Sequence, residues 1–241
     1  MRIDTLALPF KRIAERTQSV QDLIEAMADI TIRLGLHHFA LANHVDVART
    51  PGAIRLHNYP ACWAELYDRK GFVYLDPVHR RSHLTNEGFA WSGMNRIEPM
   101  SRLERQIMAL GADHGIGEGF TVPVHLPGEA ATCTFVNITG DPIAPAIQAL
   151  AQLAGTAGFC AARRLFRQSG GRNPALRPAL TPQQIAVVQR MAQGKSDRQI
   201  AEDLHIAEET AATHVRDIYC RYGVNKRPHL IYLAVKDGYI I

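Results

Sequence analysis

The sequence predicts an α+β fold, with an N-terminal α-β-α sandwich around a central antiparallel sheet and a small all-α C-terminal domain of four helices. Three observations predict it. Apolar residues recur at helical spacing near the start of the chain, two strand-like runs flank a Pro-Gly turn, and four capped helical segments follow a polar, Gly- and Pro-rich stretch. A length of 241 residues has room for two unequal domains.

The N-terminal domain begins with a recognisable helix. Ser19 and Asp22 resemble a capping box, apolar residues then recur at helical spacing, and Gly35 ends the helix. The turn Leu126-Pro-Gly-Glu129 favours type II geometry and joins two strands. Strands are predicted at His38–Ala42, Phe120–His125 and Ala131–Ile138, and further helices at Asn58–Tyr67 and Ala144–Phe166.

The domain boundaries follow from the polar stretch Gln168–Pro178, which has no periodic apolar pattern and is typical of a flexible linker. We therefore predict a domain at 1–167, a linker at 168–178 and a second domain at 179–241.

The composition is ordinary, with 46% hydrophobic and 21% charged residues and a mean hydropathy of −0.12. A net charge of +4 permits a polyanionic partner without requiring one. No acidic residue occurs between Asp141 and Asp197, so this stretch is either a solvated linker with flanking charge or a basic seam that faces phosphate. Both interpretations stay open for its cations, which are Arg163, Arg164, Arg167, Arg172, Arg177, Arg190 and Lys195.

The cysteines and histidines indicate neither disulfides nor a metal. The four cysteines are widely spaced, form no Cys-x-x-Cys pair and follow no signal peptide, so we expect reduced thiols in a cytoplasmic protein.

The uncharged segment from Pro142 to Ala162 is long enough for a membrane span but is rich in Ala, Gly and Gln. We expect a helix packed on a core, no membrane, no metal and no cofactor.

The C-terminal domain shows four helices with clear ends. Thr181 and Pro182 begin the first and Gly194 ends it, while Ser196 caps the second, Asp197–Leu204. The third runs from Glu208 to about Arg221 until Gly223 stops it, and Pro228 begins the fourth. Two short helices with a tight connection are typical of a helix-turn-helix, whose second helix enters the major groove of DNA. Amphipathic helices alone would equally suit a plain helical bundle, so the pattern of individual residues decides.

The residue pattern here resembles the LuxR-type DNA-binding domain. The resemblance rests on Leu180-Thr181, Gly194–Glu202, Leu204, Ile206 and Thr210–Val224, and covers nearly all of 179–241. Gln184, Ala207 and Ala212 depart from the family, which usually has Glu, a Ser-like cap and often a basic residue there. Arg216 is the best candidate for a base or phosphate contact, because a guanidinium can bridge guanine O6 and N7. The expected DNA contacts are Thr210, Thr213, Arg216, Arg221 and Lys226.

A second constellation lies upstream. Tyr59, Trp63 and Tyr67 precede Asp76-Pro77 at a fixed spacing, followed by Trp91 and Gly119. This pattern resembles the autoinducer-binding domain of LuxR-type quorum-sensing regulators, which bind N-acyl homoserine lactones. A phosphorylated receiver domain is not expected, because the N-terminal acidic residues do not cluster. The six expected ligand-binding residues are Tyr59, Trp63, Tyr67, Asp76, Trp91 and Thr134.

The resemblance implies a role for each of these side chains, and their chemistry suits such a ligand. The Trp63 indole donates to the lactone carbonyl, the Asp76 carboxylate accepts from the amide N–H, and Tyr59 donates to the amide carbonyl. Thr134 assists at that carbonyl, and Tyr67 and Trp91 form apolar walls. Ala64 follows Trp63 where some relatives carry an Arg that reads a 3-oxo group, so no strict 3-oxo dependence is expected.

The sequence thus predicts a quorum-sensing regulator that binds an N-acyl homoserine lactone and, as a homodimer, binds double-stranded promoter DNA, as an activator. RNA polymerase is a candidate further partner. One alternative is a LuxR-type regulator that responds to a different small molecule or to none. Another is a lactone or amide hydrolase, which no Gly-x-Ser-x-Gly elbow or Cys–His arrangement supports; no catalytic residue is expected.

Overall fold

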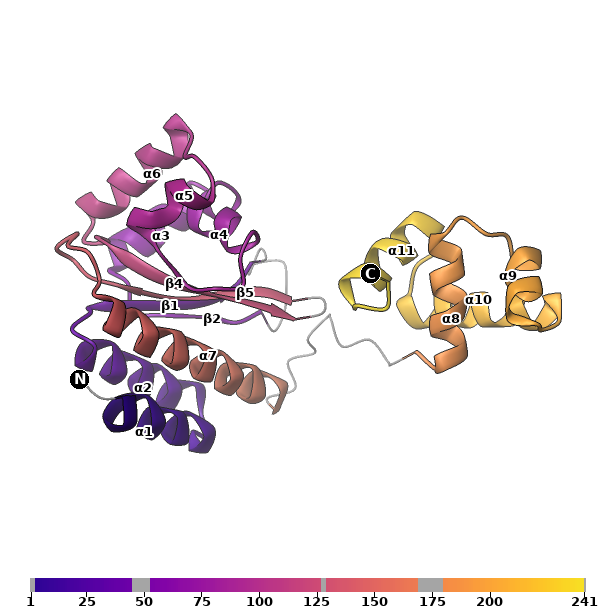
Figure 1. The fold of residues 1–241 in the computed structure, drawn as a ribbon, viewed down its shortest axis with the longest axis horizontal. Coiled ribbons are helices and arrows are strands. Elements are labelled where there is room, and N and C mark those ends of the chain that lie inside the picture. Colours follow the sequence, from indigo (N-terminus) through magenta and orange to yellow (C-terminus); the bar gives the residue numbers. More distant parts are fainter. Residues whose placement is uncertain (1–2, 45–52, 127–128, 169–179, 241) are drawn as a thin grey trace. The chain divides into compact units, whose positions relative to one another are not determined.

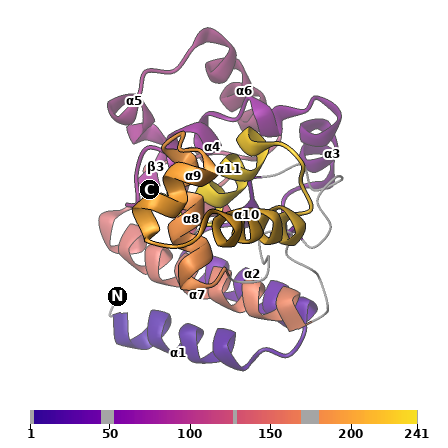
Figure 2. The same cartoon turned by 90° about the vertical axis from the view of Figure 1, so that its right-hand side faces the viewer.

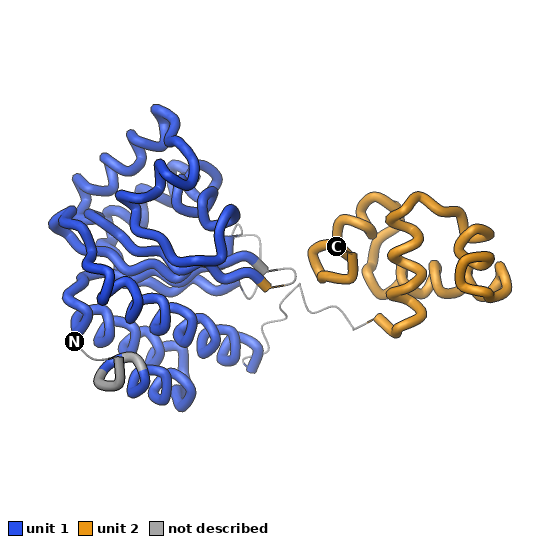
Figure 3. The backbone as a smooth tube through the Cα atoms, in the orientation of Figure 1, with its two compact units in different colours: residues 1–125, 130–173 blue, residues 126–129, 174–241 orange. Residues whose placement is uncertain are grey.

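The structure is a computed structural model that describes residues 3–44, 53–126, 129–168 and 180–240 (Figure 1). The chain forms two compact units: residues 1–125 and 130–173 make up the first, and the second contains 174–241 (Figure 3). The predicted linker lies outside the described residues except for Gln168, the last residue of α7 (Pro145–Gln168). The predicted boundaries of the linker therefore stay predictions.

A five-stranded sheet in the order β2-β1-β5-β4-β3 forms the middle of the first unit. Strand β1 lies antiparallel to both β2 and β5, and β3 lies antiparallel to β4. The strands are β1 (His38–Asn43), β2 (Arg55–His57), β3 (Phe89–Ala90), β4 (Gly119–Leu126) and β5 (Glu129–Val136). The three predicted strands correspond to β1, β4 and β5, while the predicted Pro-Gly turn lies partly outside the described residues.

Helices cover both faces of the sheet, which confirms the predicted α-β-α sandwich (Figure 1). On one face α1 (Ile3–Arg16), α2 (Val20–Arg33) and α7 lie side by side (Figures 1 and 2). The other face carries α3 (Ala61–Arg69), α4 (Pro77–Ser82), α5 (Met94–Ile97) and α6 (Arg102–Asp113), with the short 3-10 turns η2 (Phe72–Tyr74) and η3 (Trp91–Gly93).

Small residues let α7 lie close against the sheet. A Cβ on Gly155 would lie 3.0 Å from Val122 Cγ2 of β4, and one on Gly158 would lie 2.5 Å from Met27 Sδ of α2. Leu150, Ala151 and Ala154 of the same helix are buried. The Ala- and Gly-rich composition of this segment is therefore that of a tightly packed core helix. Among the described residues, no helix combines the length and apolarity needed to cross a membrane.

The ends of the first helices follow local chemistry. The predicted capping box of α2 is present, with Ser19 Oγ accepting from Asp22 N and Asp22 Oδ2 accepting from Ser19 N. The helix predicted at 58–67 begins later, at Ala61. Pro60 is its N-cap residue, and the Asn58 side chain is occupied by β1, because its Oδ1 accepts from Phe39 N at 2.7 Å.

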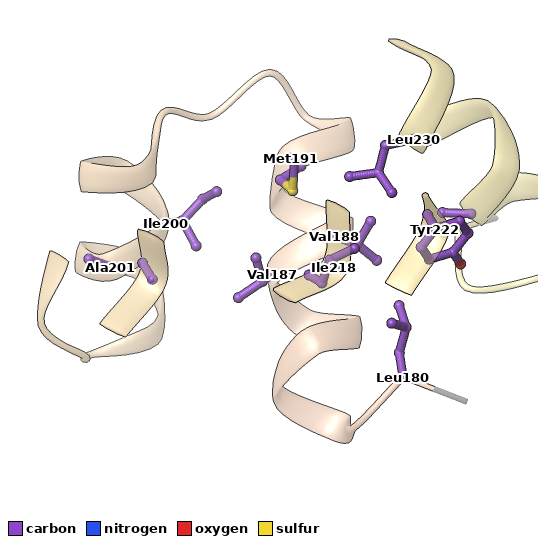
Figure 4. Packing of buried hydrophobic residues seen from close by; sticks show 11 residues of the cluster. Leu180, Val187, Val188, Met191, Ile200, Ala201, Ile218, Tyr222 and Leu230 are labelled. Carbon is purple, nitrogen blue, oxygen red and sulfur yellow. The ribbon is translucent and has the colours of Figure 1, made fainter. Parts of the chain in front are cut away.

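The second unit contains the predicted helices, α8 (Pro182–Ala192), α9 (Asp197–Leu204), α10 (Glu208–Tyr222) and α11 (Arg227–Lys236). Thr181 and Ser196 cap α8 and α9 through capping boxes with Gln184 and Gln199. Gly223 ends α10 with a left-handed φ of 63°. Figure 4 shows how Val187, Val188, Met191, Ile200 and Ile218, among others, interlock in one core. The predicted positions of these helices are therefore confirmed.

Candidate functional site

A cavity of about 380 Å³ lies on the face of the sheet opposite α7. The alternation of side chains along β1 explains its position, because Phe39 and Leu41 are buried towards the α2 and α7 layer while Ala40 and Ala42 line the cavity. The floor consists of Ala40, Ala42, Arg55, His57, Thr132 and Thr134, and the walls include Trp63, Ala64, Tyr67, Val73, Tyr74, Asp76, His79, Trp91, Ile107, Met108, Gly111 and Ile116.

All six side chains that the sequence analysis named as ligand contacts line this one cavity: Tyr59, Trp63, Tyr67, Asp76, Trp91 and Thr134. They come from the segment between β2 and α3 (Tyr59), from α3, the N-cap of α4, η3 and β5, so segments far apart in the sequence converge here. Their contact with a ligand stays a prediction.

Asp76 is held at both carboxylate oxygens. It is the N-cap residue of α4, and its Oδ1 accepts a 2.7 Å hydrogen bond from Val78 N. Its Oδ2 accepts a 2.6 Å hydrogen bond from the Tyr67 hydroxyl. Burial, and then the neighbouring Asp76, raise the pKa of Tyr67 well above its ordinary value, which keeps this hydroxyl protonated. Each oxygen retains a lone pair that can accept from a ligand N–H.

Tyr59 and Trp63 offer donors to the cavity. Burial, and then Asp76, raise the pKa of the Tyr59 hydroxyl, so it stays protonated and able to donate. The Trp63 ring packs edge-on against Tyr67, with ring centroids 5.8 Å apart, and lies 3.5 Å from the Cβ position of Gly111. Both donors therefore sit in an apolar setting that strengthens any hydrogen bond they form.

A chain of hydrogen bonds holds the opposite wall. Trp91 Nε1 donates to Thr121 Oγ1 at 2.9 Å, and Thr121 Oγ1 lies 3.0 Å from Thr134 Oγ1. The Trp91 ring fits only because residue 119 is glycine, since a Cβ there would lie 2.4 Å from Trp91 Cε2. The sequence predicts only an apolar wall at Trp91 and no role for Thr121. A threonine inside the apolar strand β4 was the available signal, because a buried hydroxyl needs a partner.

Arg81 holds α4 in place. The sequence gives no indication of this role. Its side chain is fully buried and donates to the carbonyl oxygens of Pro77, Met94 and Glu98, and to Glu104 Oε1 at 3.1 Å. It therefore ties α4, whose N-cap residue is Asp76, to α5 and α6. Arg81 is a positioning residue for this side of the cavity.

Four histidines gather beside the cavity: His44, His79, His83 and His125. His79 lines the cavity, and its Nε2 lies 4.0 Å from Asp76 Oδ2. Burial, and then His79, His83 and His125, lower the pKa of His44 to about 2. The signal for this cluster in the sequence is the helical spacing of His79 and His83, to which no role was assigned. Within the described ranges, no group of three or more His, Cys, Asp or Glu side chains is arranged to hold a metal ion.

The DNA-contact residues predicted in the second unit occupy the exposed side of α10 and the segment after it. Thr210, Thr213, Arg216, Arg221 and Lys226 are all exposed. Thr213 Oγ1 donates back to Glu209 O at 2.8 Å, and Lys226 is the N-cap residue of α11. Ala207 is the N-cap residue of α10 and supplies no side-chain hydrogen bond there, as its identity implies.

Several cations of the acid-free stretch have partners within their own unit. Arg164 donates to Ala14 O and to Thr17 O at 2.7 Å, which ties α7 to the end of α1. Arg190 and Lys195 both pair with Asp203. Arg172 and Arg177 lie outside the described residues. Arg164, Arg190 and Lys195 thus each make contacts that hold parts of their own unit together.

The two units match two family models. Residues 19–165 match the autoinducer binding domain, and residues 178–234 match the luxR family of bacterial regulatory proteins. The chain belongs to the LuxR-type quorum-sensing transcriptional regulators. The autoinducer-binding match includes every cavity residue that the sequence analysis named, so in this LuxR-type regulator the cavity is the candidate site for a small-molecule ligand.

Curated relatives are similar over most of their length. The transcriptional activator TraR of Agrobacterium vitis is 30% identical over 76% of this chain and 78% of its own. The transcriptional activator BjaR1 of Bradyrhizobium diazoefficiens is 29% identical over 76% of this chain and 74% of its own. This LuxR-type regulator is therefore a member of a family of transcriptional activators.

Solved structures share the fold. Escherichia coli SdiA matches with a TM-score of 0.75 and 17% identity over 100% of both chains. A complex of SdiA with octanoyl-rac-glycerol matches with a TM-score of 0.71 and 18% identity over 98% of this chain and 93% of that one. At these identities the likeness establishes the fold alone.

Proposed function

We propose that this regulator binds an N-acyl homoserine lactone in the cavity between the sheet and α3–α6, and that the liganded protein binds promoter DNA as a homodimer to activate transcription. One observation carries the proposal. Six residues that the resemblance to autoinducer-binding domains names as ligand contacts line a single cavity, with Asp76 fixed by Tyr67 and Val78.

Both carbonyl groups and the amide N–H of such a ligand have a partner in the proposal. The Asp76 carboxylate accepts from the amide N–H, and the Tyr59 hydroxyl donates to the amide carbonyl with help from Thr134. The Trp63 indole N–H donates to the lactone carbonyl. Tyr67 and Trp91 enclose the lactone ring, with Ile107, Met108 and Ile116 supplying further apolar surface around it. Pairing every buried polar group matters because an unpaired one costs about 1–3 kcal/mol.

The second unit supplies the output in this proposal. The exposed side of α10 enters the major groove, with Arg216 reading a base or a phosphate and Thr210, Thr213, Arg221 and Lys226 contacting DNA around it. Two-fold pairing places two copies of α10 on a palindromic site. The relatives are named as transcriptional activators, and the proposal of activation rests on those names. The protein then acts in the cytoplasm, with RNA polymerase as a further partner. The protein acts as a regulator with no metal, cofactor or catalytic residue.

Co-purification tests the ligand. The full chain is expressed with a panel of acyl homoserine lactones of different chain length, or with octanoylglycerol, and the purified protein is analysed by mass spectrometry. The proposal expects a stoichiometric lactone and a higher soluble yield, because a ligand that binds only the folded state stabilises it. Retention of octanoylglycerol or another compound, with every lactone absent, would support the alternative of a regulator that senses a different molecule.

A gel-shift titration tests the DNA contacts. Affinity for a promoter fragment should fall steeply as salt rises, because phosphate contacts release counterions. Arg216→Ala should weaken binding by about 1–3 kcal/mol if Arg216 reads a base. Arg33→Ala, a change of an exposed arginine on α2, is the matched control and should leave affinity unchanged. Salt-independent binding would contradict the proposal.

A further inference from the structure

His57 is a cavity residue to which neither the resemblance nor the sequence analysis gives a role. It lies on the edge strand β2, and its Cα partner on β1 is Ala40, which in turn pairs with Thr134 of β5. All three residues line the cavity. The side chain between His57 and Thr134 is thus a single methyl group, which leaves the cavity floor open from Thr134 to the imidazole.

The imidazole is polar, neutral and incompletely paired. Its Nδ1 is buried and has no hydrogen-bond partner among the described residues. Burial, and then Arg55, lower the pKa of His57, while Asp68 raises it, so the ring is uncharged at neutral pH. A buried N–H without an acceptor is costlier than an unused lone pair, which favours the tautomer with its proton on Nε2. Nε2–H is then the one donor of this ring.

We propose that His57 determines acyl-chain specificity, by donating from Nε2 to an oxygen atom carried on the acyl chain of the ligand. The proposal rests on the function proposed above. With the homoserine lactone amide at Asp76 and Thr134, the acyl chain crosses Ala40 towards His57. An unsubstituted chain leaves the imidazole unpaired, whereas a keto or hydroxyl oxygen pairs with it.

Two other cavity residues, Ala64 and Arg55, do not duplicate this donor. Ala64, directly after Trp63 on α3, contributes only a methyl group. The nearby Arg55 guanidinium is already held by Asp68, with Nη1 to Oδ1 at 2.8 Å and Nη1 to Oδ2 at 2.9 Å. His57 therefore offers a neutral donor beside the floor residue Ala40.

The test compares equal-length octanoyl homoserine lactones that carry no oxygen, a 3-oxo group, a 3-hydroxyl group or a terminal hydroxyl group. Affinities are measured by competition on the full chain and on three variants. His57→Leu removes the donor, His57→Gln restores an N–H donor, and His37→Leu changes an exposed histidine outside the cavity as a control.

The parent and His37→Leu should prefer at least one oxygenated ligand over the unsubstituted one by about tenfold, or about 1.4 kcal/mol. His57→Leu should abolish that preference while binding the unsubstituted ligand at least as tightly, and His57→Gln should restore part of it. Equal affinities of the parent for all four ligands, or an unchanged preference in His57→Leu, would overturn this inference alone. Failure of the parent to bind any lactone would overturn the proposed function with it.

Discussion

The Tyr67 hydroxyl donates a 2.6 Å hydrogen bond to Oδ2 of Asp76, and the two residues belong to different elements, α3 and the N-terminus of α4. The bond fixes the rotamer of a carboxylate whose other oxygen caps α4. Tyr67, which was expected to serve as an apolar wall, therefore also orients the Asp76 carboxylate, the acceptor proposed for the ligand amide.

Replacing Tyr67 with Phe should weaken ligand binding without removing the wall. The ring remains, but Asp76 loses a charge-assisted hydrogen bond and its fixed orientation. A hydrogen bond to a charged group is worth about 1.5–3 kcal/mol. Only the part of this energy that orients Asp76 affects ligand binding, so we expect the affinity for an acyl homoserine lactone to fall roughly five- to twentyfold. Titration by intrinsic fluorescence measures it. Tyr232→Phe, at an exposed tyrosine of α11, is the control, and equal affinities for Tyr67→Phe and the parent would refute the positioning role.

Replacing Thr121 with Val should destabilise the first unit. The change keeps the shape but leaves Trp91 Nε1 without its acceptor and removes a partner of Thr134. We expect a loss of about 1–3 kcal/mol in the free energy of unfolding. Both tryptophans of the chain, Trp63 and Trp91, lie in this unit, so their fluorescence during urea unfolding reports on it selectively. Thr121→Ser retains the hydroxyl and should lose less; if Val and Ser variants unfold alike, the hydrogen-bond chain contributes nothing.

The histidine cluster should lower the free energy of unfolding at acidic pH. The pKa of His44 is about 2 in the folded protein and 6.5 in the unfolded chain. Between these values the unfolded state binds the extra proton, so the stability that neutral His44 provides is complete above pH 6.5 and is lost as the pH falls. The loss approaches about 1.4 kcal/mol for each pH unit below 6.5.

Urea unfolding at pH 7.5 and pH 5.5 measures this effect. The decrease in unfolding free energy should be about 1.4 kcal/mol smaller in His44→Gln than in the parent, because one pH unit separates 5.5 from the unfolded pKa. His229→Gln, on α11, is the control. An identical decrease in the parent and His44→Gln would show that His44 is not the proton-linked group.

Replacing Ala207 with Ser should stabilise α10. Ala207 has the extended backbone of an N-cap residue, with φ −67° and ψ 149°, but offers no oxygen to the first turn. A serine hydroxyl can accept from an N–H there, which is worth about 0.5–2 kcal/mol. Hydrogen exchange at the start of α10 should slow accordingly, whereas Thr181→Ala, which removes the cap of α8, should accelerate exchange there. No change in α10 would mean that its first turn is already satisfied by other groups.

The structural features that could be predicted from the sequence depend on interactions that are local along the chain. Caps such as Ser19, Thr181 and Ser196, and the glycine end at Gly223, act within one or two turns of the chain. The spacing of Trp63, Tyr67 and Asp76 carried the resemblance that named cavity residues. The helix expected at Asn58 started late, because the Asn58 side chain serves β1, which is distant in sequence.

The missed features depend on tertiary contacts. Strands β2 and β3 have 3 and 2 residues, too few for a periodic pattern, and exist because β1 and β4 pair with them. The role of Arg81 requires the carbonyl groups of Met94 and Glu98 and the Glu104 carboxylate of α6, and that of Thr121 requires Trp91, 30 residues away. No local pattern encodes such partners. A buried polar residue in an apolar setting is the signal that could have drawn attention to them.

The most direct test of the ligand-binding account is the affinity of the parent, Asp76→Asn and Asp76→Ala for one acyl homoserine lactone that co-purifies with the protein. Asparagine keeps an oxygen for the α4 cap while losing the charge, so its folding should resemble that of the parent. The account predicts that both variants lose at least tenfold in affinity, about 1.4 kcal/mol, because the amide N–H loses its charged acceptor. Affinities equal to that of the parent in both variants would contradict it.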